Sequence, residues 1–220
     1  MTLQELANAV LLKATGKATV LTPTDTKYQK ILGIANAYQD SWQNEFGVDW
    51  NSLYQKDFEL GTISTTDTYE LDDEIRKISD TRGDFVQLFM GDNHVNYEIV
   101  AADTLKRYSD GAHVCAQIGR TLVFPSAFKE DSPLIGATIK APVYVSVEPL
   151  VNPTDDVAVD IPRWLVVISA AEYVRNDITK QNQYPNLIAE ADSLMDRMID
   201  DNDAQVATVY IPGMTSSRTW

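Results

Sequence analysis

The chain is poor in the residues that most often carry catalysis or bind metals. Cys115 is the single cysteine among 220 residues, which excludes an intramolecular disulfide and a zinc site built on several thiolates. His94 and His113 are the two histidines, so few side chains titrate near neutral pH. The ten glycines are scattered, and neither a phosphate-binding loop nor a Gly-x-Ser-x-Gly elbow is present. We therefore expect no catalytic residue, no metal ligand and no cofactor.

Long hydrophobic runs are also missing. The longest extends from Trp164 to Ile168, whereas a bilayer-spanning helix needs about 20 residues. The first residues, Met1 to Glu5, lack the basic and apolar regions of a signal peptide. These features predict a soluble protein that is made in a reducing cytoplasm and has no membrane partner.

Positive charge is scarce. The sequence has 18 Lys and Arg against 32 Asp and Glu, which gives a formal net charge of −14. No segment is basic, so the chain lacks the cluster of positive charge that binds phosphates. Binding to anionic membranes is disfavoured for the same reason. An acidic surface that lies beside DNA repels the DNA and does not bind it.

Hydrophobic periodicity predicts helices towards both ends of the chain. Thr2 and Glu5 fit a capping box and Gly16 can end the first helix. Asp160 is expected to cap the third helix, with Pro162 in its first turn. The predicted helices cover residues 2–15, 26–46, 160–174 and 185–199.

Between these helices the pattern changes to short runs of β-branched and aromatic residues bounded by turn residues. Alternation is clearest from Ile139 to Val147, where every second residue is apolar. Pro142 interrupts this strand and has no N–H, which indicates an edge position or a bulge. The candidate strands are residues 57–61, 68–71, 74–78, 85–90, 96–101, 114–117, 121–124 and 139–147.

The predicted fold class is therefore α+β, a helical bundle formed by the N- and C-terminal helices with an inserted antiparallel β-rich domain. Within the last segment, Val206, Val209 and Ile211 can pair as a strand, and the residues after them read as a flexible arm that orders on a partner. The expected domains are N-terminal helices 1–47, β-rich domain 48–158, C-terminal helices 159–203 and C-terminal arm 204–220.

One pair of residues and two acidic runs invite a chemical interpretation. His113 and Cys115 share a face if they lie on one strand, which could activate a thiolate or form half of a metal site. A small buried thiol beside a partly exposed imidazole is the favoured interpretation. The acidic runs Asp72–Glu74 and Asp200–Asp203 suggest solvated charge, with a weak cation site as the alternative.

The four tryptophans divide by their position in the sequence. Trp42 and Trp164 lie on apolar helical faces and are expected in the core, whereas Trp50 follows a helix stop and is ambiguous. Trp220, after a Ser-rich stretch, is either an anchor for another chain's pocket or part of a disordered tail.

Five stretches occur in a characteristic order: Thr68–Ile78, Ile118–Phe124 with Pro125, Val143–Val147, Asp160–Val174 and Leu187–Asp203. Their order resembles the head-to-tail adaptor, or head-completion, proteins of tailed bacteriophages. The resemblance covers roughly residues 60–203, and the first two helices fit it more loosely.

The resemblance implies a non-enzymatic structural protein in the neck of the virion. Such a protein forms a ring, commonly a dodecamer, that docks beneath the portal protein and extends the DNA channel towards the tail nozzle or fibre proteins. Genomic DNA would pass the lumen without specific binding, which suits the acidic composition. Residues Ile211, Met214, Arg218 and Trp220 are predicted to contact the portal or a neighbouring subunit.

Three other functions stay open. The chain could be another virion component, such as a tail or head-closure protein. It could be a hydrolase acting on cell-surface glycan through carboxylates in the β-rich middle. It could also be a carbohydrate-binding module that uses aromatic residues such as Trp50 or Tyr144.

Overall fold

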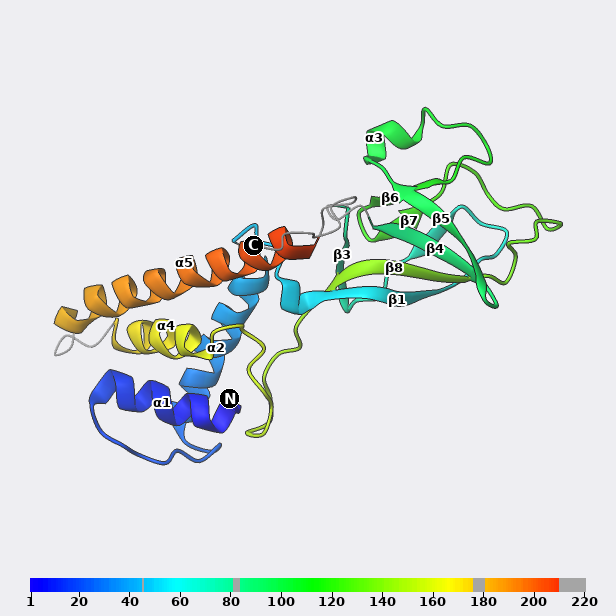
Figure 1. The fold of residues 1–220 in the computed structure, drawn as a ribbon. Helices are drawn as coiled ribbons and strands as arrows, with labels where there is room; N and C mark the ends of the chain where they lie inside the picture. Colours follow the sequence, from blue (N-terminus) through cyan, green and yellow to red (C-terminus); the bar gives the residue numbers. More distant parts are fainter. Residues whose placement is uncertain (45, 81–83, 176–180, 210–220) are drawn as a thin grey trace, which may run out of the picture. The chain divides into compact units, whose positions relative to one another are not determined.

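The computed structural model describes residues 1–44, 46–80, 84–175 and 181–209. These residues form a mixed α+β structure, as predicted, which divides into two compact units (Figure 1). The helical unit combines Met1–Ser52 with the chain from Val147 onward, and the β unit is Leu53–Ser146. We expected the β-rich domain to cover 48–158, so the structure assigns its outer residues to the helical unit.

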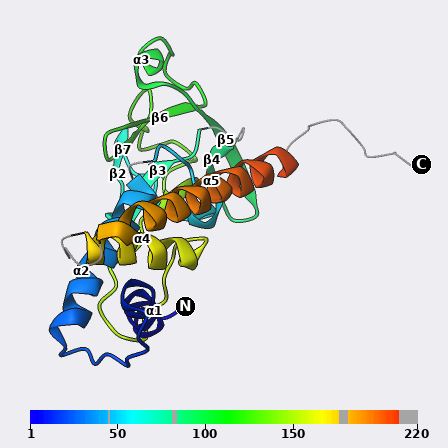
Figure 2. The ribbon, with the colours of Figure 1, turned by 90° about the vertical axis from the view of Figure 1, so that its left-hand side faces the viewer.

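The helical unit is built around one apolar helix. Helix α4 buries nine of its 13 residues and packs against α1, α2 and α5. In both ribbon views α4 lies between α1 and α5 (Figure 1, Figure 2). A helix that is apolar on nearly all sides needs partners all round, and here they come from both ends of the chain. The helices are α1 (Leu3–Thr15), α2 (Thr26–Asn44), α4 (Pro162–Val174) and α5 (Tyr184–Val209), with short 3-10 turns η1 (Asn51–Leu53) and η2 (Gln181–Gln183).

The start of α1 confirms the predicted cap, whereas the start of α4 does not. The Thr2 amide donates to the Glu5 carboxylate at 3.0 Å, and the Glu5 amide donates to the Thr2 hydroxyl at 3.3 Å. Ile161, not Asp160, occupies the N-cap of α4. Its hydrocarbon side chain accepts no hydrogen bond, and the Trp164 amide donates instead to the Ile161 backbone carbonyl at 2.8 Å. Pro162, in the first turn, has no N–H.

The end of the described chain differs from the prediction. Val206 and Val209 belong to α5, which continues through the acidic run to Val209, so the strand predicted for them is wrong and the arm does not begin at 204. An ion pair between Arg197 and Asp201, 3.7 Å apart at i,i+4, supports this part of the helix. Ile211 lies outside the described residues.

Amide side chains on one side of α2 hold the segment that returns from the β unit. Asn36 donates to the Leu150 carbonyl at 2.9 Å and accepts from the Leu150 amide at 2.8 Å. Gln39 donates to the Glu148 carbonyl at 3.2 Å, and Gln43 accepts from the amide of residue 147 at 2.7 Å. Because these bonds satisfy an otherwise irregular backbone, residues 147–158 belong with the helices.

In the β unit, the strands of the described residues form one sheet in the order β1-β8-β4-β5-β6-β7-β2, and β3 also pairs with β8. The pairs are antiparallel except β5 with β6, which is parallel, so the expectation of an antiparallel domain needs this correction. A parallel pair requires a long crossover, here residues 100–113, which include helix α3 (Ala102–Leu105). The strands are β1 (Tyr54–Thr62), β2 (Thr68–Glu70), β3 (Ile75–Ile78), β4 (Phe85–Met90), β5 (Asn93–Ile99), β6 (Val114–Ile118), β7 (Thr121–Val123) and β8 (Thr138–Val145).

Strand β8 lies inside the sheet even though it contains Pro142. On one side, the register with β1 shifts between Gln55 and Phe58, opposite the proline. On the other side, β4 pairs with residues 138–140 and β3 with residues 143–145. Pro142 therefore falls at a bulge and between two partner strands, so of the two predicted alternatives the bulge is correct and the edge position is wrong.

Asn202 of α5 is a buried polar residue that ties the helix to the residues after α2. Its side chain accepts from the Asn51 amide at 2.8 Å and donates to the Asp49 carbonyl at 3.1 Å. The Asn51 side chain donates to the Asn202 carbonyl at 2.9 Å. Next to this contact Trp50 is stacked on Trp42, with ring centroids 5.1 Å apart.

We predict that Asn202→Ala lowers the free energy of unfolding by about 1–3 kcal/mol, because a buried amide loses two hydrogen bonds. Urea unfolding followed by circular dichroism measures the difference. The exposed neighbour Asp203 provides the control, and Asp203→Ala should change stability by less than about 0.5 kcal/mol. Equal losses for the two variants would contradict the anchoring role of Asn202.

Candidate functional site

Cys115 and His113 differ in burial, as in the favoured interpretation. Cys115 is buried in β6, with its sulfur 3.8 Å from the Glu98 carbonyl oxygen. Burial raises the pKa of the Cys115 thiol to about 12, so the thiol is protonated at neutral pH. His113 is exposed, just before the strand, and its ring centroid lies 5.1 Å from that of Tyr97. The geometry favours a structural thiol over a nucleophile.

Neither acidic run gathers around a cation position. Arg120 organises the turn after β2, where it donates to the carbonyl oxygens of Leu71 and Asp72 at 3.0 and 2.6 Å and pairs with Asp73 at 3.0 Å. Residues Asp200–Asp203 lie on α5. Across the described ranges, no group of three or more His, Cys, Asp or Glu residues is placed to hold a metal ion.

The burial of the aromatic residues confirms the predicted core positions of two tryptophans and contradicts the proposed sugar-binding residues. Trp42 and Trp164 are buried, as predicted. Trp50 is 0% exposed and Tyr144 is 1% exposed, so the proposed sugar-binding role of these two side chains is wrong. Tyr144 is covered by the Tyr54 ring, with centroids 5.6 Å apart, and by the Lys77 ammonium.

The predicted partner contacts Ile211, Met214, Arg218 and Trp220 lie outside the described residues. Their role therefore stays a prediction.

An acidic residue on α5 joins three helices of the helical unit. The Glu190 carboxylate lies 2.7 Å from the Lys13 ammonium of α1 and 2.8 Å from the Arg163 guanidinium of α4. The hydrogen bond from Lys13, and then the one from Arg163, lowers the pKa of Glu190. Both bonds connect parts of the chain that are distant in sequence, so they stabilise the packing of the helices.

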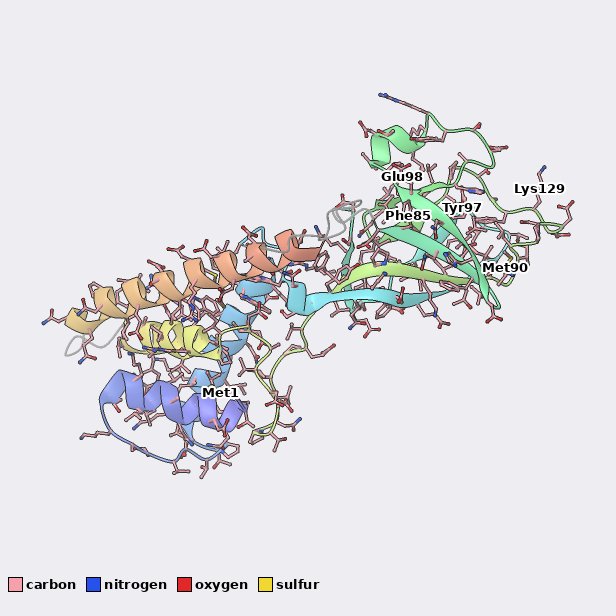
Figure 3. All side chains as sticks on the ribbon, viewed as in Figure 1. Met1, Phe85, Met90, Tyr97, Glu98 and Lys129 are labelled. Carbon is pink, nitrogen blue, oxygen red and sulfur yellow. The ribbon has the colours of Figure 1, made fainter. Side chains whose placement is uncertain are left out.

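The β unit contains an open cleft of about 520 Å³, which we call the aromatic cleft. Two loops form its walls, residues 110–113 and residues 125–134. Its floor is aromatic: the Phe124 ring meets those of Tyr97 and Phe128 edge to face, with centroids 5.2 Å apart in each case. Figure 3 labels Tyr97 on the sheet and Lys129 on the second loop.

The rim of the aromatic cleft is polar. Asp110, His113, Lys129 and Asp131 line it and are exposed. An apolar floor with a few polar groups around it is typical of a binding site. No short sequence pattern predicts this site, because β5, the residue after β7 and two separate loops contribute to it.

No family model matches the chain, and no curated protein matches it significantly. None of the described helices combines the length and apolar character that a bilayer-spanning segment requires.

We predict that Cys115 does not react with a thiol reagent such as Ellman's reagent at pH 8 in the folded protein, because burial keeps it protonated and inaccessible. Unfolding in urea should release one reactive thiol per chain. Rapid labelling without denaturant would show that the thiol is accessible, and Cys115→Ser gives the blank.

We predict that Glu190→Gln lowers the free energy of unfolding at pH 7 by about 1 kcal/mol, since the two ion pairs are partly exposed. The depressed folded-state pKa means that the carboxylate stabilises the fold fully above its ordinary pKa of 4.5. This contribution is lost as the pH falls through the folded-state value. Denaturant unfolding at pH 7, 5 and 3 should therefore show the two proteins converging at low pH.

The matched control for that measurement is Asp201→Asn, which removes the exposed ion pair within α5. Its effect should stay below about 0.5 kcal/mol at every pH. A Glu190→Gln difference that does not shrink as the pH falls from 5 to 3 would contradict the role of the ionised carboxylate.

Proposed function

We propose that this protein is a structural component of a tailed-bacteriophage neck, an adaptor ring that joins the portal to the tail and extends the DNA channel. The observation that supports it most is architectural. Helices from both ends of the chain meet in one unit, and a β unit is inserted between them. This is the element order on which the resemblance to head-to-tail adaptors depends.

In this proposal the two units have separate tasks. The helices α1, α2, α4 and α5 act as a bundle and provide the lateral contacts between subunits. Exposed apolar side chains at Leu12 and Val20 favour such contacts, since neighbouring copies would remove them from water. The β unit presents its loops to the next component.

Three sets of polar side chains have structural tasks. Glu190 joins helices, Arg120 organises a turn, and the amides of α2 hold the returning segment. This use of polar groups supports a protein that works through packing and assembly.

A glycan-acting hydrolase or carbohydrate-binding tail module is the second candidate. The aromatic cleft favours it, because Asp110 and Asp131 lie at the rim above an aromatic floor. Turnover or binding of glycans that is lost in Asp110→Asn and Asp131→Asn would favour this candidate over the adaptor.

The proposed adaptor function predicts that deletion of residues 211–220 weakens assembly and portal docking while the fold stays intact. Sedimentation velocity measures the oligomer, and circular dichroism with thermal unfolding monitors the fold. We expect the full chain to form a large oligomer, alone or with its portal, and the truncated chain to shift towards monomer. Unchanged assembly of the truncated chain would contradict the role of Ile211, Met214, Arg218 and Trp220.

The net charge of −14 adds an expectation about the channel. Asp and Glu should be enriched on the surface that faces the lumen, because attractive contacts would slow the passage of DNA. A structure of the assembled ring tests this directly, and a neutral or basic lumen would overturn that part of the proposal.

A further inference from the structure

We propose that the aromatic cleft of one copy binds residues 210–220 of a second copy, with Trp220 on the aromatic floor. This inference rests on the proposed ring, for which it names one subunit contact. The cleft and the segment match in apolar character, charge and size.

The floor of the cleft suits an aromatic guest. Tyr97 and Phe124 are almost fully buried, Phe128 is partly exposed, and the three rings already pack edge to face. A further ring can extend this arrangement, because edge-to-face and offset contacts add to the gain from burial alone. His113, tilted by 37° against Tyr97, forms part of the wall and offers a second flat surface.

The charges at the rim favour this segment as the guest. Asp110 and Asp131 line the rim together with Lys129, so the rim has two carboxylates and one ammonium group. Residues 210–220 contain Arg218 and no Asp or Glu, so Arg218 can pair with a rim carboxylate. Arg218 stands two residues before Trp220, which allows the cation to reach the rim while the indole lies on the floor.

The segment has the length for such a contact. Helix α5 ends at Val209, and the following eleven residues span at most about 36–40 Å when extended. A cleft of about 520 Å³ holds several side chains, within the range of about 300–1,000 Å³ that is usual for ligand sites.

A second copy is the occupant we commit to, because the proposed ring brings neighbouring copies together. The contact is then heterologous, since a segment of one copy meets a different surface on the next, and such contacts form a ring when the rotation between copies closes. Insertion of the segment into the cleft of its own chain would add nothing to assembly and is a distinct outcome of the test.

The test is photo-crosslinking on the full chain, with p-benzoylphenylalanine introduced at Thr219 so that Trp220 is retained. Unlabelled and ¹⁵N-labelled copies are mixed before assembly, irradiated, digested and analysed by mass spectrometry. We expect adducts on residues 110–113 or 125–134, with the two peptides carrying different isotopes in about half of the adducts from an equal mixture.

Two variants test the chemistry. Asp131→Lys should reduce the yield of these adducts at least five-fold, and Arg218→Glu in the same chain should restore it in part by pairing with the new lysine. The matched control is Asp103→Lys on α3, an exposed residue that does not line the cleft, and its yield should equal that of the parent chain. Equal yields for Asp131→Lys and Asp103→Lys would overturn the proposed contact.

The remaining outcomes separate this inference from the proposed function. A ring whose adducts map elsewhere overturns the inference and leaves the adaptor standing. Adducts with one isotope only indicate docking within a chain and also overturn it. A chain that stays monomeric with and without its portal, and shows no mixed adducts, overturns both. Glycan binding that Asp131→Lys abolishes, without adducts at the cleft, identifies a sugar as the occupant instead.

Discussion

The burial of α4 is the constraint on which the helical unit depends. With nine of 13 residues buried, this helix is stable only when neighbours cover it on several sides, since each large apolar side chain contributes about 1.5–3 kcal/mol through burial. Those neighbours are α1 and α2 from the start of the chain and α5 from its later part. The β unit between them is therefore an insertion, and the chain must return from it to the helices. The Asn36, Gln39 and Gln43 amides of α2 meet this requirement by hydrogen bonding the returning segment.

Several side chains that could have carried a function also have structural roles. Side chains that the sequence marks as candidates for chemistry are engaged in packing: Cys115 is buried in the sheet, Trp50 is stacked on Trp42, and the acidic run after Ile199 continues a helix. Partners can therefore contact the protein surface, above all the aromatic cleft with its charged rim. The proposed adaptor would use such surfaces for its contacts.

The local elements could be predicted because their signals are local. The Thr2–Glu5 capping box, the period of each helix and the alternation in β8 all depend on residues close in sequence. The parallel pairing of β5 with β6 could not be predicted, because it is set by a long crossover whose path depends on the rest of the sheet. Asp160 is a suitable cap by residue type, but the N-cap is Ile161, whose backbone carbonyl accepts from the Trp164 amide. The candidate site was missed for a similar reason, since Tyr97, Phe124 and the two loops meet only in the folded unit.

Electron microscopy of the purified full chain, alone and mixed with its portal protein, tests the central claim most directly. The account predicts closed rings, in which identical subunits surround a channel wide enough for duplex DNA. A single-subunit particle under both conditions, with a bound substrate or sugar in the β unit, would contradict it.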